Sequence, residues 1–218
     1  MKLKQNQKLL FIGDSITDCE RVKPEGEGLF NALGKGYVSY IDGLLQAVYP
    51  ELGIRVVNKG ISGNTVRDLK NRWQKDVLEQ KPDWLVIMIG INDVWRQFDT
   101  PFIKEGHVYL DEYRDTLRRL VTETKAHVKD IVLMTPFYIE NNEQDQMRHL
   151  MDQYGLVVKT IAEETNCLFV NTQEAFQVVL KELYPAALAW DRVHPSAAGH
   201  MVLTRAFLKA IDFDWNRP

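Results

Sequence analysis

Residues 9–17 read LLFIGDSIT, a short apolar run that leads directly into a glycine, an aspartate and a serine. Four consecutive apolar residues that end at a glycine are typical of a buried strand followed by a turn. The turn would deliver the Ser15 hydroxyl to the end of that strand. This stretch therefore predicts a serine at the edge of a sheet, near the start of the next segment.

The same kind of apolar run recurs along the chain, separated by amphipathic stretches. The further runs cover residues 54–58, 84–89, 131–135 and 168–171. Helical spacing predicts helices over 37–49, 110–128, 173–183 and 197–211, with further helical faces at 66–77 and 147–161. Strands that alternate with helices imply a parallel sheet, because each parallel connection needs a long crossover. We expect a flavodoxin-like three-layer α/β/α sandwich with a central parallel sheet of about five strands.

Composition points to one domain over residues 1–218. The chain has 218 residues, 45% of them hydrophobic, and no Pro-, Gly- or Ser-rich linker divides it. Its net charge of −3 comes from interspersed acids and bases, which argues against nucleic acid or an anionic membrane as a partner. We see neither a signal peptide nor a membrane-spanning stretch, so we expect a cytoplasmic protein. Cys19 and Cys167 imply no disulfide framework and no zinc site.

Side-chain or backbone polar groups that could contact a ligand follow three of the predicted strands within a few positions. Ser15 follows the first strand, Gly63 the second and Asn92 the third. Ligands bind beyond the carboxyl ends of the strands in open parallel sheets, so these residues should share one rim.

Serine is a poor nucleophile unless a base takes its proton and a carboxylate holds that base in the right tautomer. Asp191 and His194 lie three residues apart in the segment DRVHP, where a short loop can aim the carboxylate at the imidazole. Ser15, His194 and Asp191 therefore form a candidate catalytic triad. Asp191 and Pro195 could instead only organise the start of the next helix, and Gly13 to Ser15 could be a simple turn.

A tetrahedral intermediate needs hydrogen-bond donors already aimed at its oxygen. The segments NKGISGN (58–64) and GIND (90–93) offer the backbone of Gly63 and the side-chain amide of Asn92. Both segments could also be ordinary turns, which Gly and Asn often form.

Four blocks together resemble the GDSL/SGNH hydrolase superfamily: GDSIT at 13–17, Gly63, GIND at 90–93 and DxxH at 191–194. They occur in the family order and span nearly the whole chain. The resemblance implies an SGNH-type fold and a cofactor-free serine esterase with no metal. It also implies that Ser15 is the nucleophile and first oxyanion donor, Gly63 and Asn92 are the other donors, His194 is the base and Asp191 orients it.

Within that superfamily the chain is similar to carbohydrate-active acetylesterases, including bacterial acetylxylan esterases. This resemblance implies an acetylated xylo-oligosaccharide or sugar as the substrate, imported because the protein is expected inside the cell. The rim loops expected at 20–36 and 93–107 show no extended apolar lid, which favours a small acyl group. Trp95 and Trp190 could offer flat faces to a sugar ring. Tyr184, Trp190 and Trp215 could belong to a homo-oligomer interface.

Other readings of the same residues stay open. Residues 60–64 nearly match the Gly-x-Ser-x-Gly elbow, which would make Ser62 the nucleophile. A lysophospholipase or thioesterase of the same superfamily would share the whole triad. A flavodoxin-like binding module would use the Gly13 loop to hold a phosphate. A metallophosphoesterase would use metal ligands chosen from Asp14, Asp18, Asp93, Asp191 and His194.

Overall fold

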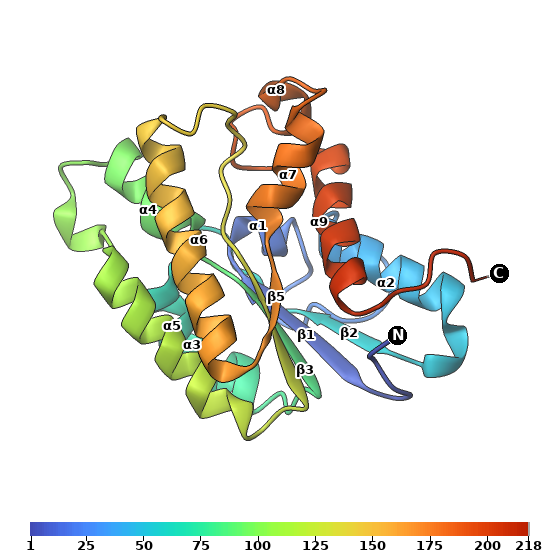
Figure 1. Ribbon diagram of the computed structural model, residues 1–218. Coiled ribbons are helices and arrows are strands. Elements are labelled where there is room, and N and C mark those ends of the chain that lie inside the picture. Colours follow the sequence, from blue (N-terminus) through green and yellow to red (C-terminus); the bar gives the residue numbers. More distant parts are fainter. Residues whose placement is uncertain (218) are drawn as a thin grey trace.

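A sheet of five parallel strands forms the centre of the computed structural model, which describes residues 1–217 (Figure 1). The strands are β1 (Lys8–Gly13), β2 (Arg55–Asn58), β3 (Trp84–Met88), β4 (Asp130–Met134) and β5 (Leu168–Val170). Their order is β2-β1-β3-β4-β5, and every neighbouring pair is parallel. The chain leaves β1 toward β2 on one side and later returns to β3 on the other. The carboxyl end of β1 therefore lies at the point where strand order reverses, the usual position of a ligand site in such sheets.

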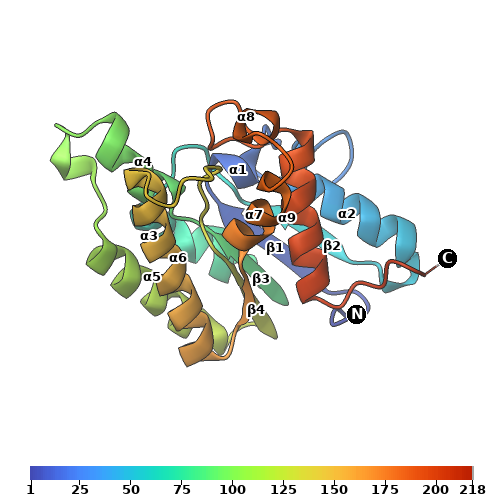
Figure 2. The same cartoon turned by 45° about the horizontal axis from the view of Figure 1, so that its top comes forward.

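Helices cover both faces of the sheet, which confirms the predicted three-layer α/β/α sandwich (Figures 1 and 2). One layer contains α2, α7 and α9, and the other contains α3, α5 and α6. The helices are α1 (Ser15–Asp18), α2 (Tyr37–Val48), α3 (Val66–Trp73), α4 (Ile91–Asp99), α5 (Leu110–Lys125), α6 (Gln146–Thr165), α7 (Thr172–Leu180), α8 (Pro185–Leu188) and α9 (Ala197–Ala210). Short 3-10 turns lie at Pro50–Leu52 and Lys104–Gly106, and a π-helical turn at Gln74–Leu78 continues α3.

The core forms because the central strands are apolar on both faces, as buried parallel strands must be. On one side of β1, the Phe11 ring packs against Tyr37 of α2 and Phe207 of α9, with ring centroids 5.7 and 5.3 Å away. In the opposite layer, Tyr113 and Tyr154 join α5 to α6 at a centroid distance of 4.7 Å. Aromatic rings therefore hold α2 and α9 against β1 in one layer and join α5 to α6 in the other.

The segment after β3 differs from the expectation. The loop expected over 93–107 is wrong for its first part, because α4 already begins at Ile91 and continues to Asp99. Gly90 makes this abrupt start possible with a φ of +129°, and a Cβ there would lie 2.9 Å from the Pro136 ring. The segment has many polar residues, and its buried apolar face consists of Ile91 and Val94. The sequence therefore shows little helical periodicity here.

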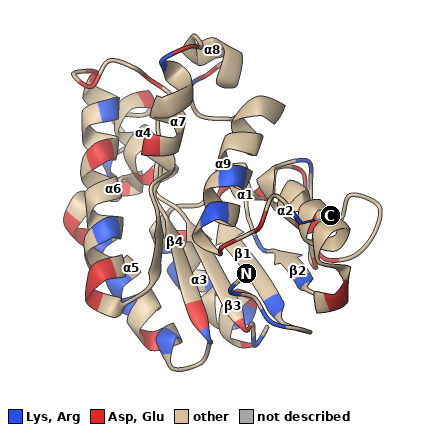
Figure 3. Ribbon diagram, turned by 45° about the vertical axis from the view of Figure 1, so that its right-hand side comes forward, with Lys and Arg blue, Asp and Glu red and all other residues tan. Residues whose placement is uncertain are grey.

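Acidic and basic residues alternate along the outer helices, where both colours occur on the same ribbons (Figure 3). The Arg118 guanidinium, for example, binds the Glu164 carboxylate at 2.9 Å and links α5 to α6. No helix within residues 1–217 combines the length and apolar character needed to cross a membrane.

Truncating Phe207 tests the packing of α9 on β1. The ring is fully buried, so F207A should lower the free energy of unfolding by about 3–5 kcal/mol through lost burial and a cavity. The matched control is F102A, because Phe102 is 95% exposed; it should change stability by less than about 0.5 kcal/mol. Urea titration measures both, and equal effects of the two substitutions would contradict this account of the core.

Candidate active site

The first strand delivers Ser15 to the rim through a tightly packed turn. A Cβ at Gly13 would lie 2.3 Å from the Met88 carbonyl oxygen on β3, so only glycine fits where the two strands end. Asp14 then caps the short helix α1, because its Oδ1 accepts a hydrogen bond of 3.0 Å from the Ile16 backbone N–H. Ser15 is the first residue of that helix, which holds its side chain at the carboxyl end of β1.

Three side chains from opposite ends of the chain form a continuous hydrogen-bonded series. The Ser15 Oγ lies 2.9 Å from His194 Nε2, and His194 Nδ1 lies 2.6 Å from Asp191 Oδ2. The second carboxylate oxygen of Asp191 accepts the backbone N–H groups of Val193 and His194, at 3.0 and 2.8 Å. The loop between α8 and α9 thus fixes the aspartate and the imidazole relative to each other through contacts that do not involve the serine.

The charge on Asp191 is stabilised by this loop. Partial burial alone would raise its pKa, but the hydrogen bonds from His194 and the two backbone N–H groups outweigh burial, so the pKa of Asp191 lies below its usual range. An ionised carboxylate accepts only, so Nδ1 of His194 must carry the proton that it donates to Asp191. The neutral ring then has its lone pair at Nε2, where it can accept the Ser15 hydroxyl proton.

Gly63 and Asn92 lie in neighbouring segments at the same rim. The Asn92 side-chain amide donates to the Asn64 carbonyl at 3.0 Å, which ties the start of α4 to the residue after Gly63. This contact occupies one of the two amide hydrogens of Asn92. Gly63 has a φ of +82°, and a Cβ there would meet nothing within 4 Å. The backbone conformation at position 63, rather than crowding by protein atoms, therefore requires glycine.

The aromatic residues named from the sequence have different surroundings. Trp95 packs edge-on against the His194 ring at a centroid distance of 5.9 Å, and the Arg96 guanidinium lies over the Trp95 ring, 5.2 Å from its centroid. Trp190 directly precedes Asp191 and is 90% exposed. Tyr184 and Trp215 are also exposed, so a subunit contact through them stays a prediction.

The alternative reading of Ser62 as a nucleophile has no support in the geometry. The Ser62 Oγ donates to the Asp18 carboxylate at 3.1 Å, and its backbone N–H donates to the same oxygen at 3.0 Å. A carboxylate partner anchors the loop in place, and no histidine ring nitrogen is hydrogen-bonded to this hydroxyl among the described residues.

The carboxylates that a metallophosphoesterase would use as metal ligands are instead hydrogen-bonded to other protein groups. Asp14 caps α1, Asp18 holds Ser62, Asp93 holds the start of α3, and Asp191 binds His194. Residues 1–217 contain no group of three or more His, Cys, Asp or Glu side chains that could hold a metal ion.

The sequence does not predict that two carboxyl groups near the rim, those of Asp14 and Asp93, are buried. Burial raises the pKa of Asp14 to about 7 and that of Asp93 to about 8. Asp93 Oδ1 accepts from the Val66 backbone N–H at 3.0 Å, while its Oδ2 has no partner within residues 1–217. Asp93 therefore joins the start of α3 to the helix that carries Asn92. Asp93 is buried because it lies on α4, a helix that the sequence pattern does not predict.

Known proteins are similar to this chain over nearly its whole length. The model of the GDSL-like Lipase/Acylhydrolase family matches residues 11–202. An acetylxylan esterase of Geobacillus stearothermophilus is 76% identical over 217 residues, which is 100% of this chain and 99% of that protein. The crystal structure of Axe2, an acetylxylan esterase from that organism, matches with a TM-score of 0.98 and 76% identity over 99% of this chain and 98% of that one.

Crystal structures of Axe2 variants described as catalytic mutants match this chain as well. They carry the substitutions S15A, D191A and H194A, at residue types and numbers that coincide with those of this chain. Each is 75% identical to it, with TM-scores of 0.99, 0.99 and 0.98. For S15A and D191A the match covers 100% of both chains, and for H194A it covers 99% of this chain and 98% of the other.

The raised pKa of Asp93 predicts a specific pH dependence of stability. Asp93 keeps its proton up to about pH 8 when folded but ionises near pH 4 when unfolded, so folding takes up a proton between these values. The free energy of unfolding must therefore fall as pH rises through that window. The D93N variant lacks this titration, so its stability relative to wild type should improve between about pH 5 and about pH 8, by up to about 1.4 kcal/mol per pH unit. Urea titrations at both pH values measure the difference, and parallel pH profiles would show the assignment to be wrong.

Proposed function

The chain belongs to the GDSL-like lipase/acylhydrolase family, and from that premise we propose that it is a serine esterase that removes acetyl groups from xylo-oligosaccharides. The observation that carries the proposal is the hydrogen-bonded series from Ser15 through His194 to Asp191. We also propose that residues 1–218 form a single SGNH-hydrolase-like domain.

The proposed reaction passes through an acetyl-enzyme. Ser15 Oγ attacks the ester carbonyl carbon while Nε2 of His194 accepts the hydroxyl proton, and the carbonyl electron pair moves to oxygen. The tetrahedral intermediate collapses, the bond to the sugar oxygen breaks, and the imidazolium protonates the departing alcohol. Water then attacks the acetyl-serine with His194 as its base, and release of acetate restores the Ser15 hydroxyl. Asp191 stays ionised throughout and stabilises the imidazolium, in keeping with its lowered pKa.

The negative oxygen of the intermediate needs fixed donors, and the proposal assigns them to the backbone N–H groups of Ser15 and Gly63 and to the side-chain amide of Asn92. The Asn92 contact with the Asn64 carbonyl supports this assignment, because it fixes the orientation of the amide next to the Gly63 segment. The amide hydrogen that this contact leaves over is the one available to the substrate oxygen.

The acetylated sugar is supported by the relatives and by the surroundings of the triad. Axe2 is described both as an acetylxylan esterase and as an acetyl-xylooligosaccharide esterase, and a variant of it at 75% identity covers this chain completely. The loop that carries Asp191 and His194 presents the exposed Trp190 at the rim, and Trp95 lies against the imidazole. We propose that these two indoles face the sugar rings, since flat apolar faces suit the CH surfaces of a sugar.

Replacing each serine separately tests the assignment of the nucleophile. S15A should lower kcat on an acetyl ester by about 10⁴–10⁶-fold, since it removes the attacking atom. S62A is the matched control, because Ser62 binds a carboxylate and not a base, and it should keep kcat within about tenfold of wild type. Steady-state kinetics on 4-nitrophenyl acetate measure both. A large loss in S62A together with an active S15A would reverse the assignment.

A substrate panel tests the acyl group and the alcohol. The panel contains acetylated xylo-oligosaccharides, 4-nitrophenyl esters of acetate and of long-chain acids, a lysophospholipid and an acyl thioester. We expect the highest kcat/KM on the acetylated xylo-oligosaccharides and a steep fall with acyl length among the aryl esters. A preference for the long-chain, phospholipid or thioester substrates would instead indicate the lysophospholipase or thioesterase branch of the family.

A further inference from the structure

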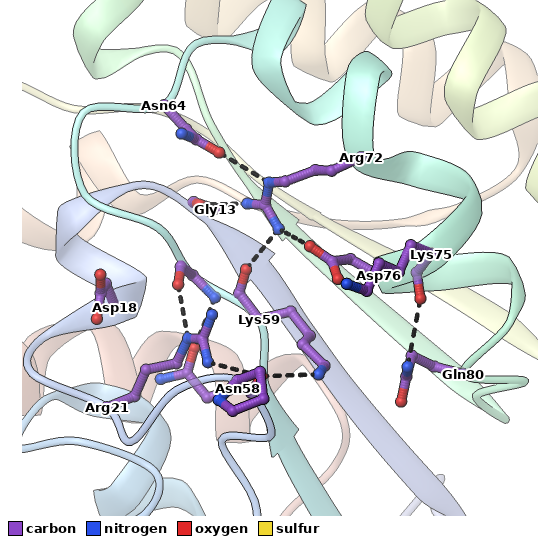
Figure 4. A network of polar contacts seen from close by, with 12 residues as sticks. Gly13, Asp18, Arg21, Asn58, Lys59, Asn64, Arg72, Lys75, Asp76 and Gln80 are labelled. Carbon is purple, nitrogen blue, oxygen red and sulfur yellow. Dashed lines mark hydrogen bonds and ion pairs between the residues drawn. The ribbon is translucent and has the colours of Figure 1, made fainter.

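Arg72 lies in the last turn of α3, and its side chain is only 14% exposed. Besides the neighbouring Asp76, its guanidinium reaches the end of β1 and both ends of the loop at 59–64 (Figure 4). Nη1 donates to the Lys59 carbonyl at 2.7 Å and to the Asp76 carboxylate at 2.9 Å. Nη2 donates to the Gly13 carbonyl at 3.1 Å, and Nε donates to Asn64 Oδ1 at 2.7 Å. Every nitrogen of this group is therefore used.

The three partners other than Asp76 are next to residues of the candidate active site. The Gly13 carbonyl ends β1 two residues before Ser15, and the Lys59 carbonyl follows β2 at the start of the loop that contains Gly63. Asn64 comes directly after Gly63, and its carbonyl accepts the Asn92 amide at 3.0 Å. One planar cation thus connects the segment of the nucleophile with the segment of the oxyanion donors.

Other contacts hold the loop at 59–64 without Arg72. The Asp18 carboxylate binds Ser62, and the Arg21 Nε donates to the Gly60 carbonyl at 2.6 Å. The Ile61 backbone N–H also donates to the Gly13 carbonyl, at 3.1 Å. The loop should therefore keep its overall path when Arg72 is replaced. What Arg72 adds is a rigid connection between the end of β1 and both ends of this loop.

We infer that Arg72 is a positioning residue, which sets the distance between the Ser15 hydroxyl and the oxyanion donors at Gly63 and Asn92. The inference rests on the proposed function, since it concerns the same reaction. A guanidinium carries five N–H donors in a fixed plane, and a lysine ammonium cannot reach all four partners from one point. An arginine is therefore specifically suited to this position.

The inference predicts a fall in kcat with little change in KM. A shift of about 1 Å in a reacting group can cost on the order of a hundredfold in rate, even when the substituted residue is remote. We expect R72K to lower kcat by about 10–100-fold. The donors act mainly on the charge that develops in the transition state, so KM should change by less than about threefold.

Two companion variants separate positioning from folding. D76N removes the ion pair but leaves the arginine contacts with Gly13, Lys59 and Asn64, so its kcat should stay within about twofold of wild type. R72M/D76N removes the guanidinium without leaving an unpaired carboxylate, and it should lose as much kcat as R72K or more. Each kcat on 4-nitrophenyl acetate is calculated per site that reacts to completion with diethyl 4-nitrophenyl phosphate, so unfolded protein does not count.

The outcomes distinguish this inference from the proposed function. Losses of kcat in R72K and R72M/D76N, with slower phosphorylation and an unaffected D76N, would support it. It would be overturned if both variants kept wild-type kcat per reactive site, if only KM rose, or if D76N lost as much as R72K. A wild-type enzyme active on 4-nitrophenyl acetate but not on acetylated xylo-oligosaccharides would refute the proposed substrate alone. A wild-type protein inert toward both esters and the phosphate would refute both.

Discussion

The hydrogen bond between Ser15 and His194 joins residues 179 positions apart, so it depends on how the last helix is seated on the first strand. Two contacts hold α9 in place: Phe207 packs on Phe11 of β1, and His200 accepts the backbone N–H of Tyr37 at the start of α2 at 3.2 Å. Burial lowers the pKa of His200 to about 4, so this imidazole remains neutral and keeps the lone pair that the contact requires. The geometry of the candidate site is therefore a consequence of packing between α9 and the N-terminal half of the chain.

The sequence predicted those features that depend on local pattern. The five strands and the helices over 37–49, 110–128, 173–183 and 197–211 are confirmed to within a few residues, because long apolar periodicities carry much information. The placement of Ser15, Gly63 and Asn92 at one rim also follows from the parallel strand order. The roles of these residues in the reaction stay proposals that the kinetic experiments address.

What the sequence could not provide are contacts between polar groups distant in the chain. Helix α4 was missed because polar residues dominate its exposed face, and the burial of Asp93 follows from that helix. Nothing in the sequence distinguishes Arg72 from the other charged residues of the segment 66–77. Only the folded structure turns its guanidinium toward the Gly13 carbonyl at the end of β1 and the Lys59 carbonyl just after β2. Such networks are defined by tertiary structure, and no short motif encodes them.

The glycine at position 13 has an implication for how this family is recognised. Its lack of a side chain is required by the Met88 carbonyl of β3 and by Thr17, whose Oγ1 a Cβ would approach to 2.5 Å. That requirement comes from strand packing and is independent of whether ester bonds are cleaved. A descendant that had lost its hydroxyl nucleophile, and had become a pure carbohydrate-binding protein, would still have to keep this glycine. Its presence in a distant sequence is thus a marker of shared architecture, and enzymatic competence has to be judged from the serine, histidine and carboxylate themselves.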